Sequence, residues 1–160
     1  MDKLDIVTDE SGNEVVLLPE IIFSNKQNIN WNDVEDYLGK YVGELIEIAE
    51  TRDIIYIGNK FPDEYGGSSY TRKTKGARAK AKANAAQGIR EMVEIATDKV
   101  YRENHKEKHS EDAHNGWFYY VTRFAIPLYN NEKKTGEYNV YSACLVVNHA
   151  ANGKNVSSMM

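Results

Sequence analysis

The chain has 160 residues, a single cysteine and a formal net charge of −4. One cysteine excludes an intramolecular disulfide framework, which is typical of proteins in a reducing compartment. The longest apolar runs, residues 15–18 and 143–147, are too short to span a bilayer, and the acidic N-terminus MDKLDIVTDE lacks the pattern of a signal peptide. We therefore expect a soluble cytoplasmic protein without membrane contact, folded as one domain over residues 1–160.

The first sixty residues are acidic and are expected to contain a hairpin, a helix and two strands. A turn over residues 11–13 joins two β-prone stretches. Asn30 is the expected N-cap of a helix that begins near Trp31 and ends at Gly39. The two strands are predicted at residues 42–49 and 53–58.

An alanine-rich helical region is predicted over residues 72–98. The stretch before it, residues 61–71, is predicted to be a loop because its proline and glycines interrupt any regular pattern. Six of the ten residues from 77 to 86 are alanine, the best helix former. Gly88 is expected to bend the region or divide it into two helices. The predicted buried stripe consists of Ala81, Ala85, Ile89, Met92 and Ala96.

The same region begins with the strongest charge feature of the chain. Residues 1–71 have a net charge of −10, residues 72–82 have +6, and residues 83–160 are balanced. Solvated helix faces usually alternate in sign, whereas this block contains no acid. Such a block attracts phosphate or an acidic protein surface, so we expect a binding role for it. Its basic residues are Arg72, Lys73, Lys75, Arg78, Lys80 and Lys82.

The strongest strand signal is GWFYYVTRFAIPLY (116–129), which follows an irregular polar segment over residues 100–116. Strict alternation predicts a core face and an opposite face. The core face holds Phe118, Tyr120, Phe124, Ile126 and Leu128, and the opposite face holds Trp117, Tyr119, Val121, Arg123 and Ala125. A turn over 130–136 and a second strand over 138–149 complete the pattern. It predicts an α+β fold with an antiparallel sheet packed against the alanine-rich, basic helical region.

Several residues near these strands have the chemistry of a metal-independent ribonuclease. A simple hairpin places Trp117 near His149, so that Tyr119, Arg123 and His149 share one face, although a slip of one residue moves His149 to the core face. An imidazole can take the 2′-hydroxyl proton and an arginine can stabilise the charged phosphorane, while aromatic rings stack on bases. The candidate catalytic residues are His109, Arg123, His149 and Tyr119, and Trp117 joins the basic block as a candidate nucleic-acid contact.

Three less specific interpretations remain open for these residues. The histidine-rich loop can be a solvated surface, Arg123 can pair with an acidic neighbour, and the tyrosines suit any half-exposed sheet. A zinc site would use His105 and His109 with Glu107, Glu111, Asp112 or His114 as a third ligand. The segment lacks helical apolar periodicity and a CxxC motif, so we expect no metal and no cofactor. Cys144 is expected to be a buried small hydrophobe.

Four segments resemble the large polyvalent protein-associated domains encoded by bacteriophages and conjugative elements. They are FPDEYGGSSYTRKTKGARAKAKANAAQG (61–88), KHSEDAHNGW (108–117), RFAIP (123–127) and EYNV (137–140). The resemblance covers a family-like core over residues 61–154. It implies a mobile-element protein in the bacterial host cytoplasm, engaged in conflict with host defences or in protection from them.

The resemblance also implies a distant likeness to ribonucleases of the barnase, EndoU, colicin and RelE types. The positions that it assigns for testing are Lys108, His109, Asp112, Trp117, Arg123 and His149. Two features depart from the family pattern. Asn148 stands where the pattern has an arginine, and residues 155–160 read as a short tail where the pattern has a further strand.

Two functions of different classes follow. The first is a counter-defence protein that engages RNA or single-stranded DNA through the basic helix and the aromatic sheet face, and acts in its catalytic form as a metal-independent ribonuclease. The alternative is a non-catalytic inhibitor that binds a host defence protein directly. Its acidic N-terminal half would then mimic nucleic acid toward a basic cleft.

Overall fold

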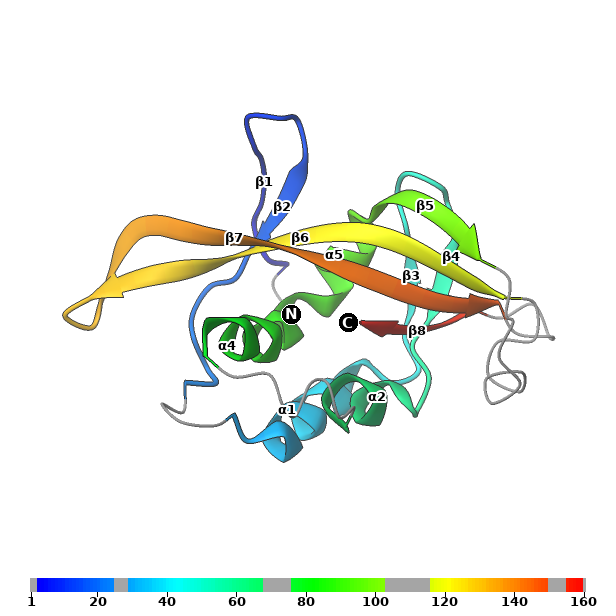
Figure 1. Ribbon diagram of the computed structural model, residues 1–160, viewed down its shortest axis with the longest axis horizontal. Helices are drawn as coiled ribbons and strands as arrows, with labels where there is room; N and C mark the ends of the chain where they lie inside the picture. Colours follow the sequence, from blue (N-terminus) through cyan, green and yellow to red (C-terminus); the bar gives the residue numbers. More distant parts are fainter. Residues whose placement is uncertain (1–2, 25–28, 68–75, 103–115, 150–154, 160) are drawn as a thin grey trace.

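The computed structural model describes residues 3–24, 29–67, 76–102, 116–149 and 155–159. In Figure 1, a long hairpin crosses above a layer of helices and extends beyond it at one end. The strands are β1 (Ile6–Thr8), β2 (Glu14–Leu17), β3 (Leu45–Glu47), β4 (Ile54–Tyr56), β5 (Thr97–Arg102), β6 (Trp117–Asn130), β7 (Lys133–His149) and β8 (Asn155–Met159). The helices are α1 (Trp31–Leu38), α2 (Phe61–Gly67), α4 (Ala77–Asn84) and α5 (Ile89–Glu94), with 3-10 turns η1 (Gly39–Tyr41) and η2 (Ala85–Gly88).

The strands form one sheet in the order β1-β2-β6-β7-β8-β4-β3, and β5 pairs with the N-terminal part of β6. The predicted α+β class is confirmed. Most neighbouring strands are antiparallel, as expected, but β2 runs parallel to β6 and β4 runs parallel to β8. Parallel neighbours require long connections, and both pairs join segments far apart in the chain. No helix in the described ranges is long and apolar enough to cross a lipid bilayer.

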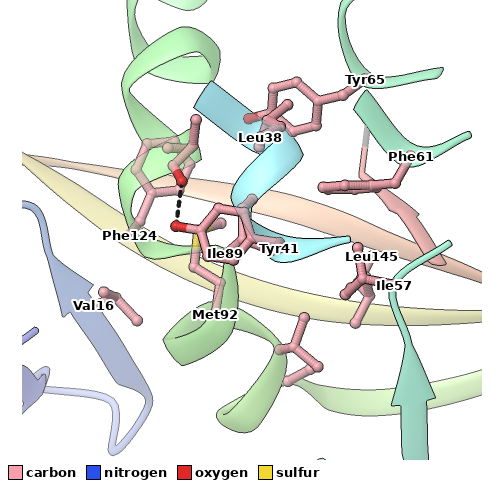
Figure 2. Close-up of a cluster of buried hydrophobic side chains, with 14 of the residues drawn as sticks. Val16, Leu38, Tyr41, Ile57, Phe61, Tyr65, Ile89, Met92, Phe124 and Leu145 are labelled. Carbon is pink, nitrogen blue, oxygen red and sulfur yellow. Dashed lines mark hydrogen bonds between the residues drawn. The ribbon is translucent and has the colours of Figure 1, made fainter. Parts of the chain in front are cut away.

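The core lies between the helices and one face of the sheet. Of the predicted core face of β6, Tyr120, Phe124 and Ile126 are buried, and Phe118 packs partly buried against the core. Leu128 is only partly buried, and Ala125, predicted on the opposite face, is fully buried as well. The whole alanine-rich stripe from Ala81 to Ala96 is buried beside them. Figure 2 shows Phe124, Ile89, Met92 and Tyr41 in this cluster, where the Tyr41 hydroxyl donates to the Ala86 carbonyl oxygen at 2.6 Å. Small alanine side chains let the helices approach the sheet closely, which explains why this region is alanine-rich.

The N-terminal elements confirm the expected signals. β1 and β2 form the hairpin, and Gly12 occupies its turn with φ of +86°. The Asn30 side-chain oxygen accepts hydrogen bonds from the backbone N–H groups of Asn32 and Asp33, which caps α1. The predicted strands at 42–49 and 53–58 shorten to β3 and β4.

The predicted loop over residues 61–71 is wrong in its first part, because α2 occupies Phe61–Gly67. Proline is tolerated in the first turn of a helix, where its missing N–H has no partner in any case. Phe61 and Tyr65, one turn apart, are both buried with their ring centroids 5.7 Å apart. A Cβ atom at Gly66 would lie 2.9 Å from Glu35 Cγ, so the glycine lets α2 pack closely on α1.

The helical region predicted over 72–98 is divided and ends earlier. The η2 turn separates α4 from α5 at the expected position, and Gly88 is its last residue. A Cβ atom at Gly88 would lie 3.2 Å from a methyl carbon of Leu18, so close packing on β2 also favours glycine there. Residues 97–102 then form β5, where an irregular segment was expected from residue 100. Its pairing with β6 overrides the polar composition.

The C-terminal part also differs from expectation. The turn of the long hairpin is limited to Asn131 and Glu132, which both have positive φ, so β7 begins at Lys133 instead of residue 138. Residues 155–160 were expected to be a tail, but Asn155–Met159 is β8, which pairs with β7 and β4. A strand therefore fills the position where the sequence suggested an incomplete sheet.

A polar cluster centred on Asp53 links β4 to β5 and β6, which are not its neighbours in the sheet. The Asp53 carboxylate lies at the start of β4 and accepts hydrogen bonds from Tyr120 Oη at 2.6 Å, Lys99 Nζ at 2.8 Å and Thr51 Oγ1 at 2.7 Å. Burial alone would raise the pKa of the Asp53 carboxyl. The hydrogen bonds from Lys99, Tyr120 and Thr51 outweigh burial and hold this pKa below its usual value.

Candidate nucleic-acid interface

The face of the β5–β6–β7 sheet that points away from the helices is called the open face below. The strand register assigns to it Thr97, Val100, Arg102, Trp117, Tyr119, Val121, Arg123, Ala125, Pro127, Tyr138, Val140, Ser142, Cys144, Val146 and Asn148, of which Ala125, Pro127 and Val146 are buried. None of these residues is acidic, and two are arginines. One carboxylate lies beside the face, since Asp98 accepts a hydrogen bond from Thr97 Oγ1 at 3.1 Å. The opposite face meets the helices: Thr122, for example, donates from Oγ1 to the Met92 carbonyl oxygen of α5 at 2.7 Å.

An arginine stacked on a tyrosine lies at the end of the open face where β5 ends and β6 begins. The Arg102 guanidinium carbon lies 5.4 Å from the centroid of the Tyr119 ring, in a cation–π contact. Burial raises the pKa of the Cys144 thiol, and the positive charge of Arg102 partly opposes this shift. Arg102 therefore lies over Tyr119 of β6, on the same face of the sheet as Cys144 of β7. Within the described ranges, neither Arg102 nor Arg123 forms an ion pair.

The structure brings together three of the predicted site residues. Trp117, Tyr119 and Arg123 alternate along β6 on the open face, as expected, and each is partly exposed. His149 does not join them by register. Trp117 pairs with Asn148, so the backbone of His149 alternates with that of Leu145 and Val147, whose side chains are buried on the opposite face. The expectation that His149 shares the face of Arg123 is wrong, because the hairpin register differs by one residue.

The other histidine candidates fall outside the described residues. His109, Lys108 and Asp112 lie there, together with the zinc alternatives His105, Glu107, Glu111 and His114. Among the described residues, no group of three or more His, Cys, Asp and Glu side chains is arranged to hold a metal ion.

The basic block is described only in its helical half. Arg72, Lys73 and Lys75 lie outside the described residues. Arg78 and Lys80 are exposed on α4.

Lys82 is partly buried beside Tyr65, with its ammonium nitrogen 4.9 Å from the ring centroid, and burial lowers the pKa of Lys82 to about 8. The Tyr65 hydroxyl donates to the Lys82 carbonyl oxygen, so Lys82 also belongs to the packing of α4 on α2.

The basic helix and the open face are on opposite sides of the sheet. The alanines of α4 pack into the core cluster that includes Phe124 and Ile126, and Figure 1 shows α4 beneath the β6–β7 hairpin. Arg78 and Lys80 thus cannot extend the surface formed by Arg102 and Arg123. The sequence-based expectation of one continuous interface is replaced by two separate surfaces.

The sequence interpretation missed Arg102, which stacks on Tyr119 at the open face. Side chains alternate along its segment, TDKVYR. Lys99 and Tyr101 point to the core side, where both contact Phe118, and Val100 and Arg102 point to the open face. This alternation could have indicated a strand, but the prediction divided the segment between a helix and a polar loop.

Comparison with protein-family models, with curated proteins and with solved structures finds no match to this chain. The resemblance to phage-associated domains therefore stays a prediction from sequence.

Proposed function

We propose that this protein binds single-stranded nucleic acid on the open face. The observation that carries the proposal is that one face of the sheet holds Arg102 stacked on Tyr119 together with Trp117 and Arg123, while no residue that pairs across the strands on this face is acidic. Surfaces that bind single strands combine aromatic rings for stacking with basic groups that follow the phosphates.

Each residue type has a distinct part in this proposal. Arg102 and Arg123 would hold backbone phosphates, because a guanidinium offers several donors in a planar fork. Trp117 and Tyr119 would stack on bases, an interaction that contributes roughly 1–3 kcal/mol per base. Single strands are favoured over duplexes because stacking requires bases that are already splayed apart.

The test is fluorescence anisotropy with labelled single-stranded RNA and DNA, in parallel with a duplex of the same sequence. Arg102→Gln and Arg123→Gln are each expected to weaken binding and to reduce the slope of log K against log salt by about 0.7. Tyr119→Leu is expected to weaken binding with the salt slope unchanged. Lys133→Gln in the hairpin is the matched charge control and should bind like the wild type.

Variants of the basic helix α4 test whether nucleic acid binds there instead of on the open face. If Arg78→Gln with Lys80→Gln abolishes binding while the open-face variants bind normally, nucleic acid is held on the helix side instead. The ribonuclease activity depends on the resemblance and on His109, so incubation of RNA with the wild type and with His109→Ala, in the presence of EDTA, tests it separately.

The mobile-element setting and the counter-defence role are part of the same proposal, and the family resemblance supports them. The inhibitor alternative makes a different prediction. Absence of binding to any of the nucleic acids would favour a protein partner, which neutralising substitutions in the acidic first sixty residues should then release.

A further inference from the structure

The turn end of the β6–β7 hairpin, residues 129–140, is called the arm below. All of these residues are exposed, and Figure 1 shows this end of the hairpin extending beyond the helices. Within the described ranges, β2 pairs with β6 only as far as Ala125, and β8 pairs with β7 only from Leu145. The arm is therefore a two-stranded ribbon that the rest of the described chain leaves uncovered.

Three large side chains of the arm lie on a continuation of the open face. Tyr138 and Val140 belong to this face by register. Tyr129 follows Pro127 of the same face by two residues on β6, and therefore points to the same side. The exposed fractions of Tyr129, Tyr138 and Val140 are 43%, 37% and 57%. The open face thus ends at the arm in an exposed patch that contains two tyrosine rings.

The two faces of the arm differ in charge. Lys134 pairs with Tyr129 and so lies on the open face, whereas the neighbouring Lys133 points to the opposite face. From Lys134 to Tyr138 the chain takes four steps along β7, while their partners are two steps apart on β6, so a bulge of two extra residues keeps both on one side. Glu137 has no register partner on β6. Among the paired residues on this face of the arm, one is a lysine and none is acidic.

Hydrogen bonds give the bulge a defined shape. Thr135 Oγ1 donates to the Leu128 carbonyl oxygen at 3.2 Å and accepts from the Glu137 N–H at 3.2 Å. Gly136 supplies the backbone conformation that the bulge requires, with φ of +88°. The patch is therefore preformed, and a preformed surface loses less conformational freedom when a ligand binds.

An exposed path connects the arm to the rest of the open face. Ala125 and Pro127 are buried, so the path does not follow β6 at this point. It runs over β7, where Val140 and Ser142 are exposed. Ser142 pairs with the partly exposed Arg123, which leads toward the arginine–tyrosine stack at the other end of the face. The aromatic groups at the two ends therefore share one surface.

We infer that a single strand bound on the open face continues onto the arm, where bases stack on Tyr129 and Tyr138 and a phosphate contacts Lys134. Stacking on aromatic rings does not depend on base identity, because every base has a π face. The inference rests on the proposed nucleic-acid binding. It adds that the ligand is a long single strand that contacts both ends of the sheet.

The separation of the two ends sets the length of this strand. Eight residue steps of β6 lead from Tyr119 to Pro127, the partner of Tyr138, which corresponds to about 26 Å. A stacked strand rises about 3.4 Å per nucleotide, so about eight nucleotides connect the two ends. A flexible single strand can follow the twist of a two-stranded ribbon, whereas a duplex is stiff over this distance.

The test compares labelled oligothymidylates of four and sixteen nucleotides by fluorescence anisotropy with the full chain. The short one cannot contact both ends, because its three steps would each have to cover about 9 Å. The double variant Tyr129→Leu with Tyr138→Leu is expected to weaken the long oligonucleotide by at least about tenfold and to leave the short one unchanged. Tyr119→Leu should weaken both. Unchanged binding of the short oligonucleotide also shows that the double variant is folded.

The two adjacent lysines provide a matched charge pair. Lys134→Gln should reduce the slope of log K against log salt by about 0.7 for the long oligonucleotide only. Lys133→Gln, on the opposite face, should change the slope for neither.

The outcomes separate this inference from the proposed function. If the wild type binds neither oligonucleotide, the proposed function fails and the inference fails with it. If the double tyrosine variant binds the long oligonucleotide like the wild type, or loses both equally, only the inference is overturned. A change in the sedimentation of the double variant without nucleic acid would also overturn it, since the arm would then contact a second copy of the chain.

Discussion

The Tyr120 hydroxyl of β6 donates a 2.6 Å hydrogen bond to the carboxylate of Asp53, which lies at the start of β4. These strands are not neighbours in the sheet. The hydrogen bond therefore connects two strands that are separated in the order of the sheet, and Lys99 of β5 donates to the same carboxylate. This polar contact connects the strands that carry the open face to the acidic N-terminal part of the chain.

Substitution Tyr120→Phe removes the hydrogen bond and retains the buried ring. Because the acceptor is charged but partly exposed, we expect the free energy of unfolding to fall by about 1–2 kcal/mol. Urea denaturation measures the change, and Tyr138→Phe, at an exposed ring, should have no effect. An unchanged midpoint for Tyr120→Phe would show that the contact contributes nothing to stability.

The same cluster predicts a pH dependence of stability. The folded pKa of Asp53 lies below its unfolded value of 3.8, so its stabilising contribution is complete above that pH and is lost as pH falls through the folded pKa. Asp53→Asn should therefore be less stable than the wild type at neutral pH, with the difference shrinking below about pH 4. Denaturation curves at several pH values test this, and a constant difference down to pH 2 would contradict it.

Lys82 should also make stability rise with pH, but in the alkaline range. Burial lowers its folded pKa to about 8 from 10.5, so the unfolded chain binds more protons between these values and stability rises with pH. Lys82→Met should remove this rise, whereas Lys80→Met, at an exposed position of the same helix, should preserve it. Thermal melts between pH 7 and 10 compare the two, and equal slopes would refute the assignment.

The close approach of α1 and α2 at Gly66 can be tested by adding a methyl group. Gly66→Ala places a Cβ atom 2.9 Å from Glu35 Cγ, so the Glu35 side chain must move, and we expect a loss of about 1 kcal/mol. Gly39→Ala meets no atom within 4 Å and is the control. The double variant Gly66→Ala with Glu35→Ala should recover stability relative to Gly66→Ala with wild-type Glu35.

Periodic signals predicted much of this fold. The Asn30 cap, the first hairpin and the alanine stripe follow from spacing between neighbouring residues, and all three are confirmed. The buried face of β6 is confirmed at Tyr120, Phe124 and Ile126. Local spacing cannot, however, decide between alternatives that differ only in tertiary partners. The polar segment of β5 becomes a strand because β6 is available beside it, and α2 forms because Phe61 and Tyr65 reach the core.

The candidate site was predictable only along a single strand. Alternation placed Trp117, Tyr119 and Arg123 together, since that requires no knowledge of partners. The face assigned to His149 depends on the register of the hairpin, because a shift of one residue moves it to the opposite face. The assignment of Arg102 to the open face depends on recognising β5 as a strand.

The sheet that separates the open face from the helices also keeps the basic helix apart from that face. A strand of nucleic acid lying across β5, β6 and β7 would leave Arg78 and Lys80 of α4 exposed. One bound strand therefore covers only one of the two positively charged surfaces, which leaves α4 available to a second acidic partner.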